Sequence, residues 1–322
     1  MRVTCSDRGA TTAITALFLS AALGFGALVI DVGNSWQERR HLVTATDAAA
    51  LGAVQDYVRG DNGCTLSAGP LVLANNSDAT MSDCNHKPIT QTTPGWVTVE
   101  AEANVNFLFA GALGFSDTDV TSSTTARYDF AATVDGGLRP FGLCLDALDA
   151  LTPTIVPGNG EVYRIYYGKD AQPDSCGGND VPGNWGILDF DGGANSANDT
   201  KDWVLNGYDG PVSIGDVIEG DTGAISNSLK SELDFLITVD HFTLPVFDFA
   251  VENGANSEFT INNFTVVRLI DYKVTGPQED RWIELEFLDE VVQGGGGGPG
   301  GFGAYVIGIC AVDGVDIPTA CS

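Results

Sequence analysis

The chain has 322 residues, with 15 basic and 43 acidic side chains and a net charge of −28. This negative balance argues against nucleic acid and anionic membrane surfaces as ligands, because both carry charge of the same sign. About 260 residues follow the N-terminal region of residues 1–58, which is enough for one large or two small domains with hydrophobic cores.

Residues 9 to 30 form an uncharged segment that is long enough to cross a bilayer as a helix. Helix-favouring composition continues to residue 58, so we predict one helix of about 50 residues, preceded by a cytoplasmic tail at residues 1–8. A cleaved secretory signal is the weaker alternative, because the apolar part is long and no A-x-A site follows it. A buried core helix is disfavoured, because an arginine precedes the segment and an acid follows it.

Helix packing is predicted at two sets of residues. Within the apolar segment, small residues spaced four apart allow two helices to approach closely; they are Ala16, Ser20 and Gly24. Beyond it, a narrow apolar stripe suits packing against a neighbouring helix or the protein's own sheet; it consists of Trp36, Val43, Ala50, Val54 and Val58. A plain anchor stalk is compatible with the same residues.

Cysteine usage decides the predicted orientation, because the basic residues on the two sides of the span are nearly balanced. Six of the seven cysteines lie beyond the span, and an even number suits an oxidising compartment. Free buried thiols in a reducing compartment are the alternative. Six cysteines allow 15 pairings; short separations favour Cys64 with Cys84 and Cys310 with Cys321, which leaves Cys144 with Cys176.

Four motifs of the N-terminal region together resemble a known family. They are R-G-A at residues 8–10, D-V-G at 31–33, the arginine pair at 39–40 and A-T-D-A-A-A-L-G-A at 45–53. In this order and spacing they resemble the N-terminal region of the TadE/TadG-like proteins of Flp (tight adherence) pilus-assembly systems. The resemblance implies a non-catalytic protein that is anchored by its helix and packs with other pilus-assembly or pilin-like subunits.

One departure from related precursors bears on processing. Type IV pilin-like precursors typically have a glycine at the cleavage point and a glutamate five residues later, whereas Gly9 is followed at that position by Ile14. Cleavage between Gly9 and Ala10 is therefore disfavoured. The missing acid favours an anchored or accessory component over a major pilin.

Residues 31 to 134 are predicted to form one unit, in which the helix continuation lies against a small pilin-like sheet. The strongest strand, at residues 96–109, alternates between apolar and polar side chains. Every second residue from Val97 to Phe109 lies on its apolar face. A second strand is expected at residues 120–134. Residues 60–94 are polar and are predicted to be a loop or a small disulfide-held subregion.

Residues 135 to 322 are predicted to form a β-rich extracytoplasmic domain. Strands are expected at residues 141–144, 161–167, 242–251, 258–274, 281–292 and 301–312, and helices at 199–206 and 225–236. The apolar parity switches near Pro245, which predicts a β-bulge or an edge strand. Residues 294–301 are almost all glycine, so we expect a flexible hairpin loop. The passages at 182–193 and 206–216 resemble the extracellular part of some TadE/TadG-like proteins.

The sequence carries no recognisable catalytic constellation. The three histidines lack metal-ligand spacing, and no motif pairs a serine or cysteine with a base. Several oxygen ligands in a glycine-containing loop form a candidate calcium site; they are Asp189, Asp191, Asn195 and Asp199. The closing glutamate of an EF-hand is absent, and a solvated acidic loop is the simpler interpretation. The sequence predicts no cofactor, and calcium at this loop is the alternative.

These observations predict an α+β protein with a single transmembrane helix, a cytoplasmic N-terminus and an exported β-rich body at the cell surface. The predicted function is a non-catalytic component of a Flp/Tad-type pilus or surface filament assembly. Its expected partners are the bilayer and other pilus subunits, without nucleic acid, and a homo-oligomer is left open. The alternatives are a surface adhesin or binding module for calcium or glycan on the same anchor, and a processed pilin-like filament subunit.

Overall fold

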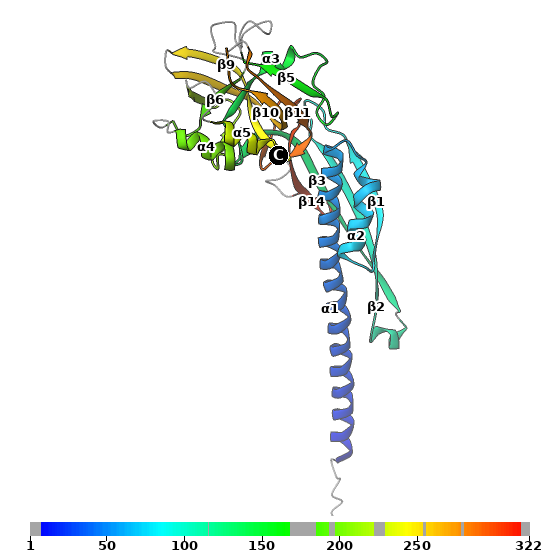
Figure 1. Cartoon of the computed structure of the whole chain (residues 1–322). Helices are drawn as coiled ribbons and strands as arrows, with labels where there is room; N and C mark the ends of the chain where they lie inside the picture. The colour runs from blue at the N-terminus through cyan, green and yellow to red at the C-terminus, as the bar shows by residue number, and fades with distance from the viewer. Residues whose placement is uncertain are drawn as a thin grey trace, which may run out of the picture.

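The computed structural model describes residues 8–114, 116–167, 185–192, 197–221, 229–253, 256–277 and 280–316. It has the predicted α+β architecture, in which a long N-terminal helix carries a β-rich body (Figure 1). Helix α1 (Arg8–Val58) is continuous over 51 residues, which corresponds to about 75 Å. Its first half projects away from the body, and its second half lies along a sheet (Figure 1).

The first sheet packs against the second half of α1. Its strands lie in the order β1 (Ala79–Lys87), β2 (Gly95–Asn106), β3 (Asp117–Asp135), β14 (Ala304–Val312) and β12 (Glu290–Val291). Three short strands extend it: β7 (Pro211–Ser213) and β13 (Gly294–Gly296) pair with β3, and β15 (Val315–Asp316) pairs with β14. The sheet therefore extends beyond the unit predicted at residues 31–134, because the last strands of the chain return to it.

The alternation predicted for the strongest strand is confirmed over β2. Its apolar face is buried against α1 and consists of Val97, Val99, Ala101, Ala103 and Val105. The strand ends at Asn106, three residues before the predicted end at Phe109. The chain turns there into the 3₁₀ helix η2 (Ala110–Leu113), which connects β2 to β3.

Small side chains let α1 approach the sheet closely. Ala49 and Ala53 are fully buried in this interface. The hydroxyl of the buried Thr46 lies 2.9 Å from that of Thr124 on β3, which in turn donates a 2.7 Å hydrogen bond to Asp47. Buried hydroxyl groups need such partners, so this network holds the helix in one register on the sheet.

Residues 60–94 are more regular than predicted. They form the π-helical turn η1 (Cys64–Ala68), helix α2 (Gly69–Asn75) and strand β1. The predicted disulfide between Cys64 and Cys84 is confirmed and joins η1 to β1, with a Cα–Cα distance of 5.7 Å. Cys144 is also disulfide-bonded and Cys310 is buried; Cys176 and Cys321 lie outside the described residues.

The second sheet contains a closed barrel. Its strands lie in the order β5 (Val162–Tyr166), β11 (Trp282–Leu288), β10 (Asn256–Lys273), β8 (Val217–Asp221), β6 (Trp185–Asp189), β4 (Phe141–Cys144) and β9 (Phe242–Asn253). Because β9 also pairs with β10, the last five of these strands close on themselves, and β11 and β5 extend from β10. Three short helices accompany the barrel: α3 (Leu145–Asp149), α4 (Ala197–Asn206) and α5 (Lys230–Leu236).

The parity switch predicted near Pro245 comes from two adjacent register shifts in the pairing of β9 with β10. The pairing skips Asp248 on β9 and Asn262 on β10, and the Asn262 side-chain amide donates a 2.9 Å hydrogen bond to the Asp248 carboxylate. A bulge interrupts the alternation of a strand, so Val246 and Phe247 can both be buried. Pro245 itself stays in the ladder.

The glycine-rich run at residues 294–301 is not the flexible hairpin loop that its composition predicts. The strands on either side of it, β12 and β14, are parallel, and its first residues form β13 along β3. The Gly298 N–H donates a 3.0 Å hydrogen bond to the carbonyl of Phe130. A Cβ atom at Gly298 would overlap the carbonyl oxygen of Ala131. Glycine thus permits close backbone packing, and backbone hydrogen bonds order the run.

Candidate functional site: the N-terminal helix and its junction with the body

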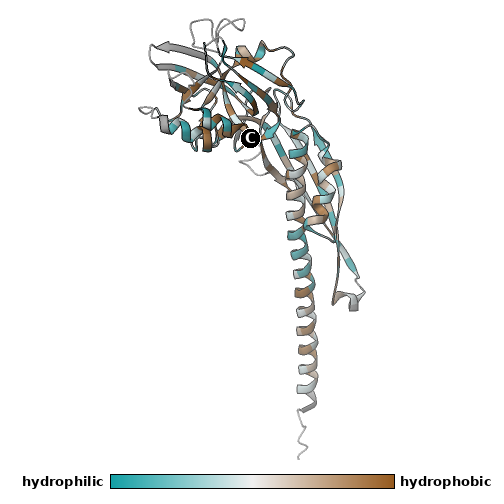
Figure 2. Cartoon of the chain, viewed as in Figure 1, coloured by the Kyte–Doolittle hydropathy of each residue, from teal (hydrophilic) through white to brown (hydrophobic). Residues whose placement is uncertain are grey.

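The apolar part of α1 lies outside the body. Figure 2 shows that this part of the ribbon is mostly hydrophobic. Its large apolar side chains are exposed; they are Ile14, Leu17, Phe18, Leu19, Leu23, Phe25, Leu28, Val29 and Ile30. A helix that is apolar on every side is suited to an apolar environment. Among the described residues, α1 is the one helix that is long and apolar enough to cross a membrane.

Asp31 lies where the apolar part of α1 meets the body, and its side chain is buried. Its carboxylate accepts hydrogen bonds from three consecutive backbone N–H groups, those of Leu108, Phe109 and Ala110, at 2.9, 3.1 and 2.6 Å. Burial opposes the charged form, but the three N–H groups outweigh it and hold the pKa of Asp31 below its usual value. Asp31 thus supplies the side-chain cap that η2 lacks in its own sequence.

Replacing Asp31 by asparagine should loosen the connection between β2 and β3. The side-chain amide would place an N–H donor where one carboxylate oxygen now accepts, so at least one backbone N–H would lose its partner. We expect hydrogen exchange at Leu108 to Ala110 to accelerate on the order of tenfold, measured by mass spectrometry. Glu102→Gln, at an exposed carboxylate of β2, is the control; unchanged exchange in Asp31→Asn would contradict the capping role.

Two ion pairs connect α1 to the C-terminal strands. The Arg39 guanidinium lies 2.8 Å from Asp313, between β14 and β15, and Arg59, directly after α1, lies 2.9 Å from Glu290 on β12. Asp313 also accepts a 3.0 Å hydrogen bond from the N–H of Ser123 on β3. Both guanidinium groups are exposed, so each pair contributes less than about 1 kcal/mol. Their effect is to orient the helix on strands that are distant in sequence.

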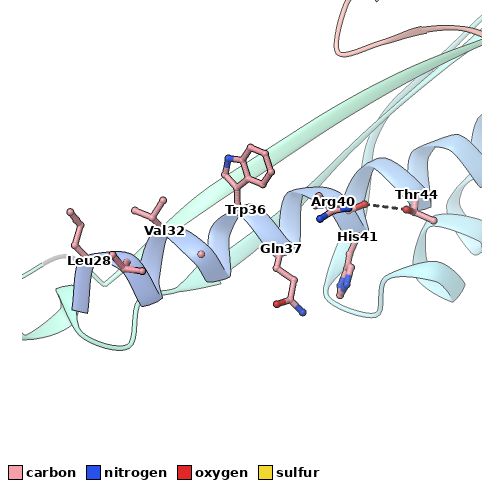
Figure 3. Close-up of a pocket in the computed structure, with 9 residues that line it drawn as sticks. Leu28, Val32, Trp36, Gln37, Arg40, His41 and Thr44 are labelled. Carbon is pink, nitrogen blue, oxygen red and sulfur yellow. Dashed lines mark hydrogen bonds between the residues drawn. The ribbon is translucent and has the colours of Figure 1, made fainter. Parts of the chain in front are cut away.

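An exposed face of α1 runs from the apolar part into the half that packs on the sheet. Leu28, Val32 and Trp36 lie one turn apart along it, and Arg40 and Thr44 continue the line (Figure 3). These side chains line a shallow, open hollow. Trp36 is 68% exposed. A tryptophan just beyond an apolar helix segment is typical of a membrane–water interface, and exposed tryptophan is also enriched in protein interfaces.

The predicted packing residues fall into two groups. Ala16, Ser20 and Gly24 lie in the exposed apolar part, and Gly9 and Ala10 lie in the first turn of α1. Of the predicted stripe, Trp36 is exposed, Val43 is half-buried and Val54 is fully buried against the sheet. Packing of the exposed group with a partner helix stays a prediction.

The predicted calcium ligands lie at the end of β6 and on α4. Asp189 is buried and accepts a 3.4 Å hydrogen bond from the N–H of Asp191, Asp199 is exposed, and Asn195 lies outside the described residues. Burial and the neighbouring Asp191 carboxyl raise the pKa of Asp189 to about 6. Within the described parts of the chain, no three acidic, histidine or cysteine side chains form a group that could hold a metal ion. Calcium binding stays a prediction.

A second carboxyl with a raised pKa lies between the two sheets. Asp289 follows β11, and burial raises its pKa to about 6, although a hydrogen bond from the Tyr305 hydroxyl opposes this shift. The folded state therefore binds this proton more tightly than the unfolded state. The free energy of unfolding therefore falls as the pH rises from about 4 to about 6, and it stays lower above that range.

Replacing Asp289 by asparagine should stabilise the protein at pH 7.5 by about 1 to 2 kcal/mol, because it removes the buried charge and keeps an acceptor for Tyr305. At pH 4 the variant and the parent should be equally stable, since the parent carboxyl is then neutral. Urea unfolding in detergent at both values of pH measures the difference. Asp209→Asn, at an exposed carboxylate, is the control. An equal gain in stability for Asp289→Asn at pH 4 and at pH 7.5 would contradict the raised pKa of Asp289.

The sequence does not predict the capping role of Asp31, although it identifies this residue as the acid that ends the uncharged segment and as part of the D-V-G motif. One signal was present: a lone carboxylate directly after an uncharged segment needs a partner at that boundary. Nothing in the sequence identified the partner, because the N–H groups that bind Asp31 are 77 to 79 residues away.

Comparison with known proteins finds a family for the helix region. The TadE/G-like Flp pilus-assembly family (Tad) matches residues 9–56. The match covers the apolar part of α1, Asp31 and the alanine-rich packing motif. No curated protein and no solved structure matches the chain. The resemblance of residues 182–193 and 206–216 to extracellular parts of such proteins therefore stays a prediction.

Proposed function

We propose that this protein, whose N-terminal helix matches the TadE/G-like family, is a non-catalytic, membrane-anchored component of a Flp (Tad-type) pilus or a related surface filament assembly. The proposal rests mainly on the difference between the two halves of α1. One half is uncharged and exposed, as a membrane span requires, and the other half is held on a sheet by buried small residues and a polar network. Such a helix connects a membrane to an ordered body.

In this proposal, residues 9–30 cross the cytoplasmic membrane, residues 1–8 stay in the cytoplasm and the body is extracytoplasmic. The disulfide between Cys64 and Cys84 supports this orientation, because disulfides persist in oxidising compartments and are rare in the cytosol. The body would then be displayed at the cell surface.

Two surfaces of α1 would contact other subunits. Inside the bilayer, Ala16, Ser20 and Gly24 would allow a second helix to approach closely. Above it, the exposed line through Val32 and Trp36 would pack against another pilus-assembly subunit, a pilin-like subunit or a second copy of this chain. Trp36 is the strongest candidate contact, because tryptophan is enriched among the residues that dominate binding energy.

Deletion of the gene in the native host tests this function. We expect the deletion to remove surface filaments seen by electron microscopy, the full chain to restore them, and Trp36→Ala to restore fewer. Leu73→Ala, at an exposed apolar residue of α2, is the matched control and should restore filaments fully. Normal filaments in the deletion strain would contradict the proposal. Normal filaments with lost surface attachment would favour the adhesin alternative.

A further inference from the structure

The connection between β2 and β3 is an uncharged, strongly apolar segment. Residues 107–116 read FLFAGALGFS, with three phenylalanines, two leucines and no charged side chain. Polar or charged residues flank it closely, namely Asn104 and Asn106 on β2 and Asp117 and Asp119 on β3. The polarity of the hairpin thus changes sharply where its strands end.

Two large apolar side chains of this connection are exposed, whereas Phe107 is half-buried. Leu108 is 71% exposed and Phe109 is 46% exposed. Exposed apolar residues gathered at one place commonly identify a surface that contacts a membrane or another protein.

The hydrogen bonds to Asp31 fix where this connection lies. The Asp31 carboxylate binds the backbone of Leu108 to Ala110, so the connection is held at the level where the apolar part of α1 ends. Figure 1 shows η2 beside α1, well away from the barrel. The exposed apolar side chains of the hairpin therefore lie at the same level as the end of the exposed apolar part of the helix.

Several backbone N–H groups of this connection have hydrogen-bond partners within the protein. Asp31 accepts from the N–H groups of residues 108 to 110, Phe107 donates to Ser116 at 3.2 Å, and Gly114 donates to Gly111 at 3.2 Å. Backbone donors that enter a membrane must find partners within the protein.

We propose that the end of the β2–β3 hairpin, residues 107–114, is a second membrane contact that inserts Leu108 and Phe109 into the interfacial layer of the bilayer crossed by α1. This inference rests on the proposed membrane anchor. A single helix leaves the body free to rotate about the helix axis, and a second contact beside it fixes the face that the body presents. Lipid is favoured over a protein partner because the segment is held at the end of the span and carries no charge or hydrogen-bonding side chain before Ser116.

Site-specific photo-crosslinking tests the contact. The full chain carries a diazirine amino acid at one position and is reconstituted in nanodiscs of phosphatidylethanolamine and phosphatidylglycerol. Position 108 tests the inference, position 18 in the span tests the anchor, and position 73 is the control, since Leu73 is a 58% exposed leucine on α2. Circular dichroism checks that each variant is folded, and mass spectrometry identifies the adducts.

We expect lipid adducts at positions 18 and 108, several-fold above the yield at position 73. Lipid adducts at position 18 without an excess at position 108 would overturn the membrane contact and leave the anchor intact. Protein adducts at position 108 would overturn it in favour of a subunit interface. Absence of lipid adducts at both positions would contradict the anchor as well.

Discussion

Replacing Gly298 by alanine should destabilise the body by about 2 to 4 kcal/mol, because the new methyl group would overlap the carbonyl oxygen of Ala131 on β3. Gly298 has no positive φ angle, so the expected loss comes from the contact alone. Relief would require the glycine-rich run to move off β3, with loss of the 3.0 Å hydrogen bond to Phe130. Urea unfolding monitored by circular dichroism measures the loss.

Substitutions at two other glycines of the run distinguish the cost of the steric overlap from the cost of backbone strain. Gly297 has φ +104° and open space where its Cβ would lie, so Gly297→Ala should cost only the strain of that φ angle, about 1 kcal/mol. Gly294 has φ +152° and would overlap the carbonyl oxygen of Thr133, so its variant should lose at least as much as Gly298→Ala. In a flexible loop, all three changes would be neutral or slightly stabilising, and that result would contradict the packed arrangement.

Placing two arginines in the apolar part of α1, by Leu19→Arg with Leu23→Arg, should remove the protein from the membrane fraction. Each arginine near the centre of a span raises the free energy of insertion by about 3 kcal/mol, so the pair costs roughly 6 kcal/mol. Both leucines are exposed in the structure, so this loss does not come from disruption of the body. Alkaline extraction of membranes followed by immunoblotting measures retention.

The matched control places the same two arginines on the body, by Leu66→Arg with Leu73→Arg. These leucines are 57% and 58% exposed, close to the exposure of the leucines in α1. We expect this variant to stay in the membrane fraction. Full retention of the Leu19→Arg, Leu23→Arg variant would contradict the assignment of residues 9–30 as the anchor.

The features that the sequence predicted correctly are those with a local cause. Helix α1 follows from a long uncharged segment and an alanine-rich continuation, and β2 follows from strict alternation between Val97 and Val105. The disulfide between Cys64 and Cys84 joins cysteines only 20 residues apart. In each case a short stretch of residues determines the outcome.

The features that were missed depend on contacts between distant segments. Composition predicts a loose loop at residues 294–301, but β3 lies beside it and supplies backbone partners from residues 130 to 134. The carboxylate of Asp31 binds backbone N–H groups at the end of the β2–β3 hairpin, 77 to 79 residues away. The strand at residues 304–312 joins the first sheet although more than 160 residues separate it from β3. No periodicity within one element encodes such pairings.

We expect the intact N-terminal helix to keep this protein in the membrane as an assembly or surface component. Mass spectrometry of the N-terminal peptide, in sheared surface filaments and in washed membranes, tests it most directly. The account predicts that the protein is found in the membranes with Arg2 to Arg8 still attached to Gly9. Protein found in filaments with Ala10 as its first residue would contradict the account and identify a processed pilin-like subunit.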